Sequence, residues 1–115
     1  MEEAVEAAEK NAELNGIENC EFIQGDVFEV LERYKGRPDV IIVDPPRAGI
    51  SPKALDRILA YGVKQMIYIS CNPKTMVENL YYLQYNGYHI KYLKPFDNFP
   101  NTKHIECICL LEKDI

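Results

Sequence analysis

The sequence predicts an α/β fold with a largely parallel sheet, because helix and strand patterns alternate along the chain. Continuous apolar runs at 39–43 and 65–70 are typical of strands that are buried on both faces of a parallel sheet. The last two strand patterns, 88–94 and 104–112, are separated by residues 95–103 without a helix. The chain is therefore expected to end in an antiparallel, hairpin-like pair of strands.

Local signals support the remaining elements. Gly16 and Gly87 follow apolar helical patterns and end them, and Ser51 followed by Pro52 is typical of a helix start. The predicted helices span residues 2–15, 27–34, 53–61 and 73–86, and a further short strand is expected at 20–24.

Composition limits the classes of protein that the chain can belong to. Its 115 residues fit one domain, and its net charge of −5 argues against independent binding of nucleic acid, which usually needs a basic face. The N-terminus does not resemble a signal peptide, and no apolar run is long enough to span a bilayer. We therefore expect a cytoplasmic protein without membrane contact.

The four cysteines are Cys20, Cys71, Cys107 and Cys109, and no two of them have CxxC spacing. A zinc site or a thioredoxin-like motif is therefore not indicated, and no metal is expected. Cys107 and Cys109 would share one face of a strand. We interpret the set as three buried thiols and one reactive thiol, rather than as disulfides.

Candidate functional residues follow the predicted strands. Asp26, Asp44 and Cys71 each come after a strand, and Glu106 lies near the start of the last one. Ligands of parallel α/β sheets bind at the carboxyl ends of the strands, and an antiparallel last strand begins at that same edge. The four residues are therefore expected to converge there.

Each candidate also has a plainer interpretation. Cys71 precedes a helix that begins near Pro73, whose N-terminus would favour a thiolate, but free cysteines are often buried and structural. Asp26 could hold an adenine amino group or cap the next helix. Glu106 could be a general base or an exposed charge.

The segment Asp44-Pro45-Pro46-Arg47 follows the predicted strand at 39–43, and it contains a carboxylate and two rigid prolines. Such a loop suits the binding of a planar base or an amine, or it simply ends the strand.

Three motifs together resemble one enzyme family. DPPRAG (44–49), YISCNPKT (68–75) and FPNTKHIECICLL (99–111) occur in the order found in RNA uracil-5-methyltransferases of the tRNA and 23S rRNA type. The resemblance extends to NAELNGIENCEFIQGD (11–26) and thus along nearly the whole chain. Asn98 departs from the family, in which an apolar residue is common at this position.

The resemblance implies that residues 1–115 form a partial, C-terminal methyltransferase domain with a Rossmann-like sheet, S-adenosylmethionine as donor and RNA as partner. It implies that Cys71 is the nucleophile that adds to carbon 6 of uracil, and that Glu106 removes the proton from carbon 5. Asp26 and Asp44 would lie near the donor. Asp44, Pro45, Pro46 and Arg47 would contact the target base.

The resemblance also implies missing parts. Family members are longer and carry an RNA-binding β-barrel, a Gly-rich donor loop and, in some, an iron–sulfur cluster. The chain would then be a fragment that is inactive alone, its binding of the donor is doubtful, and its sheet would lack two strands. The strand at 39–43 would become an exposed edge, so we expect a homodimer or a rearranged sheet.

Two other functions remain open from the sequence. The DPPR motif also serves amino-group methyltransferases, so the substrate could be an amine or another small molecule. Alternatively, the chain could be a non-catalytic α/β module that binds a partner through its exposed edge strand.

Overall fold

The computed structural model describes residues 2–96 and 105–115, which form two compact units, Met1–Tyr34 (unit 1) and Lys35–Ile115 (unit 2). The expectations for Asn98 and for the first part of the third motif, up to His104, lie outside the described residues.

Unit 1 contains helices α1 (Glu2–Leu14) and α2 (Val27–Arg33). Within residues 3–14 of α1, the half-buried residues are Val5, Ala8 and Ala12, at the spacing of one helical face. The amide of Ile17 donates to the carbonyl of Ala12 at 2.8 Å just beyond the helix end. Both predicted helices of this unit are thus confirmed, with ends shifted by one residue.

The predicted strand at 20–24 is wrong. Residues 17–26 contain no strand, and most of their side chains are exposed, including Cys20. A strand exists only where a neighbour supplies its backbone hydrogen bonds, and no strand pairs with this segment among the described residues. The exposure of Cys20 also corrects the expectation of three buried thiols.

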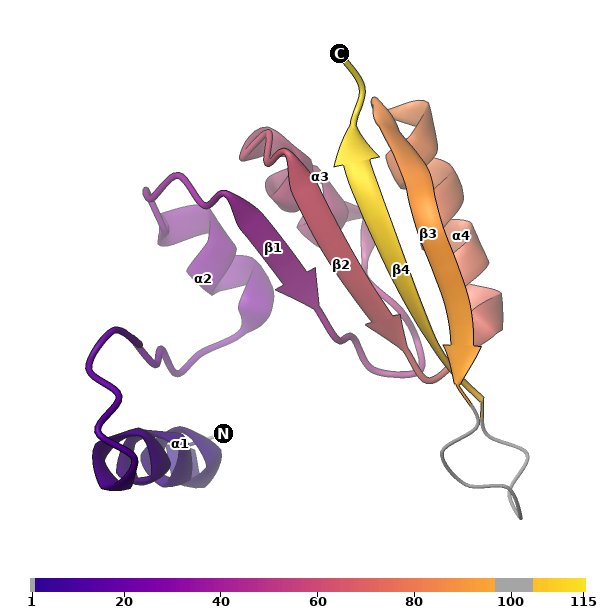
Figure 1. Cartoon of the computed structure of the whole chain (residues 1–115). Helices are drawn as coiled ribbons and strands as arrows, with labels where there is room; N and C mark the ends of the chain where they lie inside the picture. The colour runs from indigo at the N-terminus through magenta and orange to yellow at the C-terminus, as the bar shows by residue number, and fades with distance from the viewer. Residues whose placement is uncertain (1, 97–104) are drawn as a thin grey trace. The chain divides into compact units, whose positions relative to one another are not determined.

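Unit 2 is a four-stranded sheet with two helices. Its strands are β1 (Val40–Val43), β2 (Gln65–Ser70), β3 (Tyr88–Phe96) and β4 (Glu106–Lys113), and its helices are α3 (Pro52–Ala60) and α4 (Pro73–Tyr85). The strand order is β1-β2-β4-β3. β1 and β2 are parallel, whereas β4 runs antiparallel to both β2 and β3. The predicted alternation and the antiparallel end are therefore confirmed (Figure 1).

Local chemistry explains the helix ends of unit 2. The Ser51 side chain accepts a hydrogen bond from the amide of Ala54 at 3.3 Å, and Pro52 occupies the first turn of α3. Beyond the C-terminal end of α4, Gly87 has a φ of 97°, a conformation that favours glycine.

The core of unit 2 lies between the sheet and the two helices, which are on the same face of the sheet (Figure 1). Side chains from β2, β3 and β4 meet side chains from α3 and α4 there. The buried apolar residues are Ala54, Leu55, Ile58, Val63, Met66, Tyr68, Met76, Leu80, Leu83, Tyr88, Cys107, Cys109 and Leu111. The shared face of Cys107 and Cys109 is thus confirmed.

β1 forms one end of the sheet among the described residues, so the predicted edge position of this strand is confirmed. The prediction that 39–43 is buried on both sides is wrong, since Val40 is 43% and Ile42 64% exposed. An edge strand has only one neighbour, and α3 and α4 cover only one face of the sheet. Association of two copies through this edge stays a prediction.

None of the helices within the described parts of the chain is long and apolar enough to cross a membrane.

Candidate active site

Three of the four predicted residues lie at one edge of the sheet in unit 2. Asp44 directly follows β1, and Cys71 directly follows β2, which runs parallel to β1. Glu106 is the first residue of β4, and the register pairs Ser70 of β2 with Cys107. The ends of β1 and β2 and the start of β4 therefore bring a carboxylate, a thiol and a second carboxylate to the same edge.

Asp26 belongs to unit 1, where its side chain accepts a hydrogen bond from the amide of Glu29 at 3.3 Å. This is the N-cap of α2, so the capping alternative is observed. A contact between Asp26 and a methyl donor stays a prediction.

Cys71 lies in a tight turn between β2 and α4, and its side chain is half-buried. On its strand side, the buried Ser70 hydroxyl donates to the carbonyl of Asn72 and accepts from the amide of Asn72, both at 2.9 Å. On its helix side, the Asn72 side chain caps α4 by accepting from the amide of Lys74 at 3.2 Å. The backbone on both sides of the thiol is thus fixed by side-chain hydrogen bonds.

The loop after Asp44 is bonded to the first turn of α4. The carbonyl of Arg47 accepts from Asn72 Nδ2 and from Thr75 Oγ1, each at 2.9 Å. Within the loop, the Gly49 amide donates to the carbonyl of Pro46 at 2.8 Å. Asp44 itself is exposed. The loop and the thiol are therefore connected through Asn72, which flanks Cys71.

The same loop is also held at Ile50, by hydrogen bonds to Asn79 on the buried side of α4, and we call Asn79 the buried anchor of the loop. The Asn79 Oδ1 accepts from the amide of Ile50 at 2.9 Å, and its Nδ2 donates to the carbonyl of Ile50 at 3.0 Å. The Tyr68 hydroxyl also donates to this Oδ1 at 2.6 Å. Burial raises the pKa of Tyr68 to about 12, with a smaller contribution from Cys71, so the hydroxyl stays a donor.

Gly49 explains how the loop comes so close to α4. Its φ is 81°, and a Cβ built at this position would lie 2.9 Å from Asn79 Oδ1 and 3.1 Å from Thr75 Cβ. Both the conformation and the space therefore require glycine.

Sequence reasoning missed the residues that hold the site: Ser70, Asn72, Thr75 and Asn79. One signal was available, because Asn79 is a polar residue on the helix face that carries Met76, Leu80 and Leu83. A polar side chain on a buried helix face needs hydrogen-bond partners, and the segments that supply them are held in place against the helix.

The remaining thiols of unit 2 are unsuited to nucleophilic chemistry. Cys107 and Cys109 are buried. Burial raises the pKa of the Cys107 thiol, and burial together with Cys107 raises the pKa of Cys109 to about 11. Cys71 is therefore the thiol of unit 2 that is both accessible and at the functional edge.

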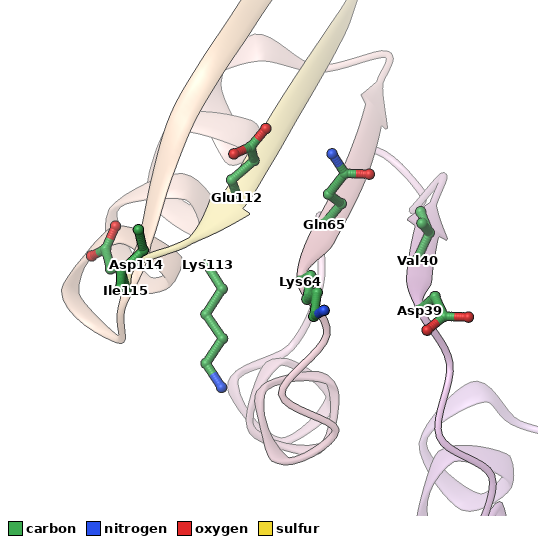
Figure 2. A pocket seen from close by; sticks show the side chains of 8 residues that line it. All are labelled: Asp39, Val40, Lys64, Gln65, Glu112, Lys113, Asp114 and Ile115. Atoms are coloured by element: carbon green, nitrogen blue, oxygen red, sulfur yellow. The ribbon is translucent and has the colours of Figure 1, made fainter.

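A hollow of about 510 Å³ lies at the other edge of the sheet, where β1 and β2 begin and β4 ends (Figure 2). Its walls carry mixed charges and no thiol, and it is separated from Cys71 by the length of β2. The residues that line it are Asp39, Val40, Lys64, Gln65, Glu112, Lys113, Asp114 and Ile115. We therefore place the candidate site at the Cys71 edge on the basis of its chemistry.

Among the described residues, no group of His, Cys, Asp or Glu side chains could hold a metal ion.

Comparisons with known proteins show the family and the fold of the chain. A family model described as tRNA (uracil-5-)-methyltransferase matches residues 26–114. An uncharacterised RNA methyltransferase of Clostridium tetani is 50% identical over 98% of this chain, and one of Thermotoga maritima is 43% identical over 96%. This chain spans only 25% of the length of each of these relatives.

Two solved structures have the same fold. The tRNA (uracil-54, C5)-methyltransferase of Pyrococcus abyssi, solved with S-adenosyl-L-homocysteine, matches with a TM-score of 0.84 and 36% identity over 96% of this chain and 26% of its own. An rRNA methylase of Streptococcus thermophilus matches with a TM-score of 0.72, covering 100% of this chain and 70% of its own. Its identity is 16%, so that likeness concerns the fold alone.

The sheet order and the solved structures define the class, an α/β domain of the S-adenosylmethionine-dependent methyltransferase type. Within this class, the chain belongs to the tRNA (uracil-5-)-methyltransferase family, whose model covers most of its length.

Proposed function

We propose that the protein methylates carbon 5 of a uracil in RNA, with S-adenosylmethionine as donor and Cys71 as nucleophile. The observation that carries the proposal is the position of an accessible thiol, directly after β2, at the same edge as Glu106, the first residue of the neighbouring strand β4, in a chain of this family. Because the chain spans a quarter of its relatives, we propose that further segments of the natural-length protein complete the activity and supply RNA binding.

The residues at the edge fit the donor. Asp44 is exposed and begins a loop stiffened by Pro45 and Pro46, which suits a ligand that carries an amino group and positive charge. S-adenosylmethionine supplies an electrophilic methyl group on a positively charged sulfur when it is bound. We propose that Asp44 contacts the donor and that Asp26 contacts its adenosine, and that Pro45, Pro46 and Arg47 contact the target base.

The reaction needs an activated carbon 5, which is a weak nucleophile in uracil. The Cys71 thiolate forms a bond to carbon 6, and the electron pair of the 5,6 double bond moves onto the neighbouring carbonyl as an enolate. Carbon 5 then bonds to the methyl group, whose former bonding pair leaves with the donor sulfur. Glu106 takes the proton from carbon 5, the double bond reforms, and the thiolate leaves carbon 6.

The proposal is tested by trapping the adduct. Fluorine at carbon 5 cannot leave as a proton does, so RNA with 5-fluorouridine should stop the reaction with the base bonded to Cys71. We expect intact mass spectrometry of the natural-length protein, incubated with this RNA and donor, to record a covalent protein–RNA species.

Two variants decide the assignment. Cys71→Ala should abolish the adduct, whereas Cys20→Ala removes an exposed thiol of unit 1 and should leave it in place. An adduct that survives Cys71→Ala would refute the assignment of the nucleophile. Methyl transfer that persists in Cys71→Ala would instead favour an amino-group methyltransferase.

A further inference from the structure

We propose that Asn79 is a positioning residue, which fixes the loop after Asp44 relative to Cys71. For its catalytic consequence, this inference rests on the proposed function. Its structural part concerns hydrogen bonds between Asn79, Ile50 and Tyr68 and does not depend on the reaction.

Most of the hydrogen-bonding capacity of the Asn79 side-chain amide is satisfied within the protein. Asn79 is 8% exposed, its Oδ1 accepts from both Ile50 N and Tyr68 Oη, and its Nδ2 donates to the Ile50 carbonyl. The pair of bonds to Ile50 imitates the pairing between two strands, so the amide fixes both the position and the orientation of that peptide. A buried network with all partners present is rigid.

The network connects the two segments that carry the proposed chemistry. Tyr68 lies on β2, three residues before Cys71, and Asn79 lies on α4, which begins two residues after Cys71. Ile50 ends the loop that begins at Asp44. A shift of the loop relative to the thiol would therefore break one buried and two partly buried hydrogen bonds, which water replaces less readily than bonds at the surface.

The loop is held at a second point, the carbonyl of Arg47, by Asn72 and Thr75 near the surface. Those two bonds involve side chains that are more exposed than Asn79, so water can replace them. Gly49 lies between the two anchors and lets the backbone approach Asn79. We therefore assign most of the positioning to the buried anchor.

Loss of the anchor should act on the rate of the chemical step. A displacement of about 1 Å between reacting groups can cost about 100-fold in rate. For Asn79→Ala in the natural-length protein, we expect kcat for methyl transfer to fall by about 100-fold, while KM for RNA stays within about threefold. Tyr68→Phe keeps both bonds to Ile50 and loses only the bond from the tyrosine, so its kcat should fall by less, about threefold to tenfold.

A second measurement is independent of catalysis. In residues 1–115, the amide of Ile50 has Asn79 Oδ1 as its hydrogen-bond acceptor, so Asn79→Ala should speed its hydrogen exchange by about tenfold or more. Glu78→Ala is the matched control, because Glu78 is an exposed neighbour on α4, and it should change neither the exchange nor kcat.

The outcomes separate the two proposals. Unchanged Ile50 exchange in Asn79→Ala, or an unchanged kcat, would overturn the positioning role. If the unsubstituted natural-length protein makes no 5-methyluridine, the proposed function fails, and the Ile50 exchange alone decides whether Asn79 anchors the loop. If Asn79→Ala does not fold, judged by its melting, Tyr68→Phe decides, and a kcat equal to that of the unsubstituted protein would count against the role.

Discussion

Replacing Gly49 by alanine tests whether the loop is held as closely against α4 as the structure indicates. Two separate costs arise. The φ of 81° is strained for any residue with a Cβ, which costs about 1–2 kcal/mol. The new Cβ would also lie 2.9 Å from Asn79 Oδ1, so the amide or the loop must move.

The second cost follows from the bonds that this movement breaks. Asn79 Oδ1 is the end of a side chain, but it is buried and accepts hydrogen bonds from both Tyr68 and Ile50. Each such bond contributes about 1 kcal/mol, so losing both costs about 2 kcal/mol. We expect Gly49→Ala to lower the free energy of unfolding by about 3–4 kcal/mol in total, the sum of the strain and the lost bonds.

Gly87→Ala is the matched control. Gly87 has a φ of 97°, but a Cβ there would meet no heavy atom within 4 Å. This variant should lose only the strain of about 1–2 kcal/mol. Urea unfolding followed by tyrosine fluorescence suits the comparison, because every tyrosine except Tyr34 belongs to unit 2 and the chain has no tryptophan. If the two variants were destabilised equally, within about 0.5 kcal/mol, the close contact between Gly49 and Asn79 would be refuted.

Two further predictions concern the thiols and the donor. In the folded chain at about pH 8, iodoacetamide should modify Cys20 and Cys71 well before Cys107 and Cys109, since burial raises the pKa of the latter pair and leaves little thiolate. Peptide mass mapping against time checks the order, and equal rates at all four would contradict it. Residues 1–115 alone should give no heat of binding with S-adenosylmethionine in calorimetry, because the sequence lacks a Gly-rich donor loop. A dissociation constant of about 1 µM would show that the described edge suffices.

The sequence predicts the positions of Asp44, Cys71 and Glu106 well, for a simple physical reason. Each position depends on where a strand ends or begins and on the direction of that strand. Apolar runs and the short connection between the last two strands contain both kinds of information. The edge can therefore be derived without any knowledge of side-chain contacts.

The anchor at Asn79 could not be derived in this way. Its partners Ile50 and Tyr68 are 29 and 11 residues away along the chain, and the bonds form only after α4 has packed against the sheet. Neither the helix pattern nor the DPPR motif indicates that Asn79 will contact Ile50 or Tyr68. Hydrogen bonds of this kind depend on tertiary packing, so the sequence indicates at most that a polar residue on a buried helix face needs partners.

The failed prediction at 20–24 and the exposure of β1 have a common physical cause. The segment CEFIQ has a suitable strand composition, but composition gives a strand only when a neighbour provides hydrogen bonds and a covered face. β1 has such a neighbour on one side, β2, and it forms, although Ile42 remains 64% exposed. Strand formation in this fold is therefore decided by the partners that each segment has among the described residues. By the same argument, exposed apolar side chains on an edge strand are a surface at which added strands would be stabilised.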